Sequence, residues 1–163
     1  MIQDVQRILE RDLEGLAREI EMFPDDESLW KVAPGITNSA GSLARHACGN
    51  LKHFVGAVLG GSGYIRQRDA EFGVRSGTRA DSAAELRETR AIVSKVLPTL
   101  SEEVLAADFP DPPGGAPVSC RRFLIHLGTH LAFHLGQAGY LRRFVTGDAR
   151  SSGPLSVREL TDL

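Results

Sequence analysis

The 163-residue sequence is poor in cysteine, and its two cysteines, Cys48 and Cys120, are far apart and lie in no paired motif. Small secreted domains that depend on disulfides carry cysteines in larger, even-numbered sets. The sequence therefore argues against a disulfide framework and indicates a chain that stays reduced in the cytoplasm. Both cysteines can be interpreted as small buried hydrophobic residues.

Long apolar runs are also missing. Asp4, Glu10 and Asp12 interrupt the first sixteen positions, where a secretory signal would need an apolar stretch. No later run reaches the roughly 18 apolar residues of a membrane span. We therefore expect no signal peptide, no membrane partner and a cytoplasmic location.

Neither sign of charge dominates, since 19 basic and 21 acidic residues give a formal net charge of −2. This balance predicts no attraction to nucleic acid, and a role in DNA repair would require a basic groove that the charge count does not offer. Gly60-Gly61-Ser62-Gly63 lacks the lysine that follows in a phosphate-binding loop, and no nucleophile elbow is present. We interpret the glycine cluster as the end of a helix.

Helical periodicity is the main pattern that the sequence contains. Apolar residues at spacings of three and four predict a first helix that Pro24 ends, with the stripe Val5, Leu9, Leu13, Leu16, Ile20 and Phe23. A second helix, capped by Asn38 or Ser39, has the apolar face Leu43, Ala47, Leu51, Phe54 and Val58.

The second half of the chain predicts two more helices. Residues 62–81 are polar, rich in arginine and glycine, and are expected to form a long crossover with at most one short helix. Ser82 and Glu85 form a capping-box pattern that predicts the start of a third helix, which Pro98 ends or kinks. The proline-rich residues 109–117 are expected to be a non-helical connector. Ser119 is expected to cap a fourth helix that ends at Gly147.

These patterns predict an all-α fold. Four amphipathic helices without a convincing strand pattern favour a four-helix bundle, in which each apolar stripe is buried against its neighbours. The long connection between helices two and three favours a crossover topology. A chain of this length fits one domain, residues 1–163.

Three histidines lie four residues apart on the fourth predicted helix, at positions 126, 130 and 134. They rise along one side of the helix at about 40° per step, and an i, i+4 pair can chelate one metal ion. His130 and His134 lie at or near the apolar stripe, whereas His126 points furthest outward. We therefore favour His130 and His134 as ligands and interpret His126 as a surface residue.

A chelating pair leaves a metal ion underliganded, so a second helix is expected to supply another ligand. Helix two offers His46, which borders its apolar stripe, and His53, which lies further toward solvent; geometry favours His46. Cys48 faces a different direction from His46. The glutamate of a His-Glu-x-x-His zinc protease does not accompany the histidine pair.

The pattern resembles the DinB/YfiT-like superfamily of metalloenzymes. The resemblance rests on residues 38–50 of helix two, which include His46, and on the segment His130-Leu-Ala-Phe-His134-Leu-Gly-Gln137. In that family, a histidine in the second helix and two histidines of a His-x-x-x-His-x-Gly-Gln segment bind a divalent metal, which implies His46, His130 and His134 as ligands here. The stretch 66–72 is similar to an arginine–acid–phenylalanine segment in some branches.

The resemblance also implies a homodimer and, in some branches, transfer of a low-molecular-weight thiol. Three neutral imidazoles can bind zinc, nickel or iron and leave coordination positions open, so the site could activate a thiol for S-transfer or water for hydrolysis of a small molecule. Gln137 or Asn50 could orient a ligand or solvent.

The alternative is a non-catalytic metal-binding bundle that serves stability, dimerisation or sensing. Four arginines of the crossover could bind a carboxylate-bearing thiol or simply be solvated: Arg66, Arg68, Arg75 and Arg79.

Overall fold

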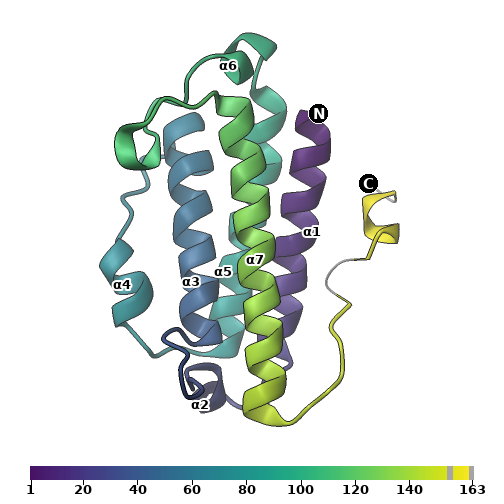
Figure 1. The fold of residues 1–163 in the computed structure, drawn as a ribbon. Coiled ribbons are helices and arrows are strands. Elements are labelled where there is room, and N and C mark those ends of the chain that lie inside the picture. The colour runs from purple at the N-terminus through teal and green to yellow at the C-terminus, as the bar shows by residue number, and fades with distance from the viewer. Residues whose placement is uncertain (154–155, 162–163) are drawn as a thin grey trace.

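The protein is all-helical in the computed structural model, which describes residues 1–153 and 156–161. Within these residues the single β interaction is an isolated bridge between Asp108 and Ser119. Long helices lie side by side (Figure 1): α1 (Ile2–Glu21), α3 (Ala40–Leu51), α5 (Arg79–Val96) and α7 (Cys120–Thr146). Short helices lie in the connections: α2 (Asp26–Leu29), α4 (Arg68–Gly73) and α6 (Glu102–Ala106), with 3₁₀ turns η2 (Leu97–Thr99), η3 (Pro113–Gly115) and η4 (Arg158–Leu160).

The long helices pack around one hydrophobic core. Both α1 and α3 pack against α5 and α7. The stripe predicted for the first helix is buried along its whole length, from Val5 to Phe23, and so is the Leu43-to-Phe54 part of the second. Burying such side chains contributes about 1.5–3 kcal/mol each, so both stripes stabilise the fold. No helix among the described residues is long and apolar enough to span a membrane.

Helix boundaries follow the side-chain caps, with one correction to the sequence prediction. Ser39 and Ser119 cap α3 and α7 as predicted, each accepting a hydrogen bond from a backbone amide three residues on. Gly147 ends α7 in the left-handed conformation, at φ 69°. The predicted capping box at Ser82 is wrong, because α5 begins a turn earlier at Thr78, whose hydroxyl accepts from the amide of Asp81 and donates to its carboxylate.

The second long helix changes its winding half-way. Beyond Leu51, the chain continues as a π-helix, η1 (Lys52–Leu59), which ends at Gly60 as predicted. Gly60 donates its amide to the carbonyl of Val55, five residues back. A π-helix advances less rotation per residue than an α-helix, and such segments are often found near functional sites.

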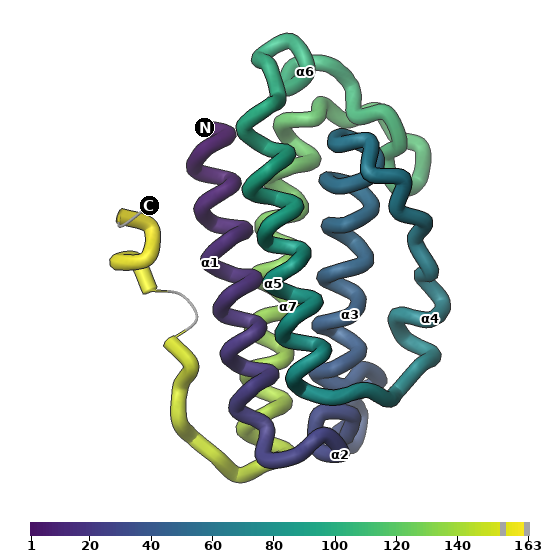
Figure 2. Tube along the Cα trace, turned by 180° about the vertical axis from the view of Figure 1, so that it is seen from behind, coloured from purple at the N-terminus to yellow at the C-terminus, as the bar shows by residue number. Residues whose placement is uncertain are grey.

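The connection from α3 to α5 runs along the length of the long helices instead of turning back at their end. Figures 1 and 2 show that α3 and α5 point the same way, so residues 60–78 return over the outside of the molecule. The single short helix in this connection, α4, packs against α3. This places residues 66–72 next to the middle of α3, where His46 lies. The proline-rich residues 109–117 form a connector that contains the 3₁₀ turn η3.

Candidate metal centre

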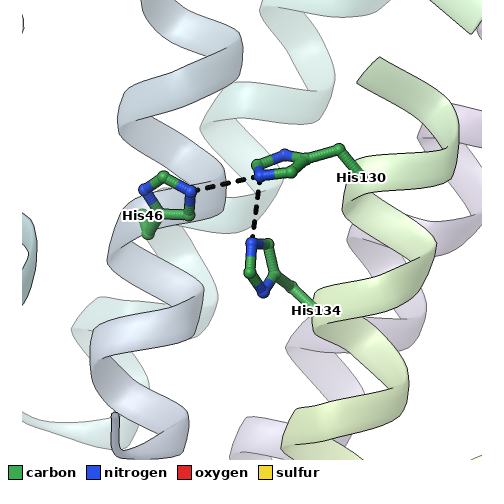
Figure 3. A group of neighbouring side chains, drawn as sticks. All are labelled: His46, His130 and His134. Atoms are coloured by element: carbon green, nitrogen blue, oxygen red, sulfur yellow. Dashed lines mark hydrogen bonds between the residues drawn. The ribbon is translucent and has the colours of Figure 1, made fainter. Parts of the chain in front are cut away.

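Three histidines from two helices meet between α3 and α7. His46 extends from the middle of α3, and His130 and His134 extend from α7 (Figure 3). The Nε2 atom of His130 lies 3.3 Å from Nε2 of His46 and 3.0 Å from Nε2 of His134. Within the described part of the chain, these three residues form a group whose ligand atoms all lie within 4.8 Å of one another. The structure thus brings together the three histidines selected from the sequence.

His46 and His134 each make a hydrogen bond through Nδ1, the ring nitrogen that faces away from the histidine cluster. These hydrogen bonds determine which nitrogen of each ring carries the proton. The Nδ1 atom of His46 is 2.8 Å from a carboxylate oxygen of Glu71, and Nδ1 of His134 is 2.8 Å from the amide oxygen of Gln137. Both oxygens are acceptors, so each Nδ1 carries the proton and donates. The Nε2 lone pairs of His46 and His134 are therefore directed toward the centre, as metal binding requires.

Two of the three Nε2–Nε2 separations agree with one shared ion. Two metal–nitrogen bonds of about 2.0–2.1 Å, meeting at an angle between 90° and the tetrahedral value, separate the two nitrogens by roughly 2.8–3.4 Å. The two distances at His130, 3.0 and 3.3 Å, fall in this range. Without an ion, His130 can offer one Nε2 proton at most to two facing lone pairs. The cluster is thus compatible with a divalent metal.

The environment keeps His130 and His134 neutral. Burial, followed by the repulsion of His134 and His46, lowers the pKa of His130 to about 4. Burial also lowers the pKa of His134, although the hydrogen bond with Gln137 opposes this change. Neutral imidazoles are the form that binds metals, so both rings can act as ligands at neutral pH, and His130 can do so well below it.

The metal-free protein is expected to lose stability as the pH falls from about 6.5 to about 4. The folded-state pKa of His130 lies below the unfolded value of about 6.5, so the unfolded chain takes up the proton first. After allowance for solvent screening of a half-buried group, we expect His130 to contribute about 1–2 kcal/mol to this loss. Urea unfolding with chelator at pH 4.5 and pH 7 would measure it. An unchanged pH dependence in His130→Gln would contradict this assignment.

A cleft of about 470 Å³ lies beside the histidine cluster and includes His46 and His130 in its wall. The other lining residues come from α3, η1, the crossover, the proline-rich connector and α7: Asn50, His53, Phe54, Arg66, Arg68, Asp111, Pro113 and His126. A small molecule could therefore approach the cluster from this side. Asn50, which the sequence suggested could orient a ligand or solvent, lines this cleft.

The remaining histidines and Cys48 lie outside the cluster. His126 is exposed and stacks on His130, with their ring centroids 5.8 Å apart. His53 lies in the cleft with Nε2 3.4 Å from a carboxylate oxygen of Asp111. Burial raises the pKa of the Cys48 thiol to about 12, which makes it a poor ligand. The sequence-based choice against these residues agrees with their positions.

Glu71 is the contact that sequence reasoning missed. It lies in α4 with only 3% of its surface exposed, beside His46. Although burial raises its pKa, hydrogen bonds from Arg66 and then from His46 give a net lowering. A buried acid in a polar connector has no periodicity to mark it, and only the similarity of residues 66–72 to a family segment pointed to this region.

The arginines of residues 62–81 are mostly engaged by the protein itself. Arg66 pairs with Glu71, Arg75 donates to the carbonyl of Thr37, and Arg79 pairs with Asp26. Arg68 lines the cleft and is exposed. Of the four arginines considered as a binding site for a carboxylate, Arg66 and Arg68 lie where a bound molecule would meet them.

The fold and the site together define an all-helical protein with a three-histidine cluster compatible with a divalent metal between two of its helices. A family model described as the DinB superfamily matches residues 7–138, and the chain belongs to this superfamily. The match covers α1 to the middle of α7 and includes all three histidines. Searches of curated proteins and of solved structures return no match.

Proposed function

We propose that this protein is a metal-dependent enzyme of the DinB-like type that binds one divalent transition metal, zinc, nickel or iron, through His46, His130 and His134. The observation that carries the proposal is the convergence of three Nε2 atoms, two of them on rings whose Nδ1 protons are already donated to protein acceptors. We also propose that the chain is a single-domain four-helix bundle in which the connection between α3 and α5 is a crossover.

The reaction we propose is transfer of a low-molecular-weight thiol to an electrophile or hydrolysis of a small molecule. An ion at the cluster would supply positive charge that lowers the pKa of a thiol or of water and polarises a substrate carbonyl. The three histidines would hold this ion at the edge of the cleft. Phe54 offers an apolar wall and Arg68 an exposed cation, which suit a small molecule with an apolar part and an anionic group.

The cleft supports catalysis over a purely structural role. Structural metal sites are closed by four protein ligands, whereas catalytic sites keep a position for substrate. In the part of the chain that the structure describes, the ligand group holds three residues, and the cleft borders two of them. A ligand set of three imidazoles beside an open cleft therefore favours an enzyme.

Metal-loaded protein is expected to turn over at least one pair from a panel of thiols and electrophilic acceptors, or one of a panel of aryl esters and amides. Elemental analysis should give one ion per chain, and His134→Ala should lose both the ion and the turnover. Thermal unfolding with and without chelator provides the comparison. If every loaded form is inactive and chelation only lowers Tm, the metal has a structural role and the catalytic proposal is wrong.

A further inference from the structure

Glu71 is held beside His46 by three hydrogen bonds to its carboxylate. One carboxylate oxygen, Oε2, lies 2.8 Å from Nδ1 of His46 and 2.8 Å from Nη2 of Arg66. The other, Oε1, lies 2.6 Å from Nε of Arg66. A two-pronged guanidinium–carboxylate pair is rigid as well as strong, so Arg66 holds the Glu71 carboxylate in one orientation toward the imidazole.

Gly49 supplies the space that this carboxylate occupies. A Cβ atom built at residue 49 would lie 2.2 Å from Oε1 of Glu71 and 2.8 Å from its carboxyl carbon. Gly49 is also three residues after His46 on α3, which puts the two on the same side of the helix. A helical glycine normally costs stability, so its presence here is explained by the close approach of Glu71.

The removal of Glu71 would leave a second donor facing His46. Nη2 of Arg66 lies 3.3 Å from Nδ1 of His46. While the carboxylate is present, Nδ1 donates to it and the Nε2 lone pair faces the metal centre. Without a well-placed carboxylate, Arg66 can donate to Nδ1, which moves the imidazole proton to Nε2 and blocks the ligand atom.

We propose that Glu71, seated over Gly49 and fixed by Arg66, is a positioning residue that selects the Nδ1–H tautomer of His46 and thereby sets the affinity of the three-histidine site for its metal. This inference rests on the proposed function. It gives the crossover between α3 and α5 a role, because that segment delivers both Arg66 and Glu71 to the side of His46 opposite the metal. The ring of Phe72, 4.8 Å from the imidazole, completes the support.

Two variants test the proposal by different routes. Glu71→Gln removes the charge and keeps the shape, whereas Gly49→Ala keeps Glu71 but displaces its carboxylate. Each is expected to weaken zinc binding by about 10–100-fold in a competition titration with a chelator, the range typical for lost support of a ligand. Two controls should keep wild-type affinity: Glu10→Gln, a buried carboxylate on α1, and Gly128→Ala, where a Cβ on α7 makes one ordinary contact, 3.9 Å from Ile8.

Nitrogen-15 NMR of the metal-free proteins gives a readout that does not depend on metal binding. Wild-type His46 should be the Nδ1–H tautomer, and both variants should shift it toward Nε2–H. If wild-type protein binds no metal, the proposed function fails, and the tautomer alone decides the positioning role. If the wild type binds zinc and both variants bind it equally well, or the tautomer does not change, the inference about Glu71 is overturned. Should one variant fail to fold, the other still decides.

Discussion

His130→Ala is expected to lower the affinity of the protein for zinc by about two to three orders of magnitude. His130 is the central member of the cluster, with Nε2 3.3 Å from that of His46 and 3.0 Å from that of His134. Four-ligand zinc sites bind with roughly 10–16 kcal/mol, or about 2.5–4 kcal/mol per ligand, and each 1.4 kcal/mol is a factor of ten. Competition titration with a chromophoric chelator would measure the loss.

His126→Ala is the matched control for this experiment. It removes the same side chain one turn earlier on α7, from an exposed position outside the ligand group. This variant is expected to bind zinc as tightly as the wild type. Equal losses in the two variants would mean that histidine number, and not the geometry of the cluster, determines binding. Undiminished binding by His130→Ala would rule out the three-histidine site.

Sequence patterns were sufficient for the parts of the fold that periodicity and caps determine. The stripe from Val5 to Phe23 is buried as predicted. Apolar residues spaced three and four apart lie on one face of a helix, and packing this face against other helices removes all of them from water. Ser119 begins α7 and Gly147 ends it, since both act through local backbone geometry. The i, i+4 spacing of His130 and His134 similarly places the two rings close together on one helix, without any tertiary contact.

Long-range contacts could not be predicted in this way. Glu71 and Arg66 lie 25 and 20 positions from His46, in a segment without periodicity, and only the packing of α4 on α3 brings them to the imidazole. The predicted start of α5 at Ser82 is wrong because Thr78 and Asp81 form a competing cap one turn earlier. The change to π-helical winding after Leu51 has no local signal in the sequence that we can identify.

A buried ion pair far from the histidines connects α1 to the end of α7. Glu19 and Arg142 are both completely buried, with Nε of Arg142 2.5 Å from a carboxylate oxygen of Glu19. Arg142 also donates to the backbone carbonyls of Asp148 and Arg150, and Glu19 accepts from the hydroxyl of Ser152. The ion pair therefore holds residues 148–152, which follow α7, against α1 and α7.

Glu19→Ala is expected to lower the free energy of unfolding by about 3–5 kcal/mol, because it removes the closest counter-charge of the buried Arg142 guanidinium and leaves only the more distant Asp148 carboxylate, 3.6 Å from Nη1. At this chain length, that corresponds to a fall in Tm of roughly 10 °C. As a control on the same helix as Glu19, Glu21→Ala removes an exposed partner of Arg87 and should cost about 1 kcal/mol or less.

A double change tests the same ion pair. In urea unfolding, Glu19→Leu with Arg142→Met should cost less than the two single changes added together, since neither charge is then left unpaired. Similar, small losses in Glu19→Ala and Glu21→Ala would show that water reaches Arg142 and that the pair contributes no more than a surface contact.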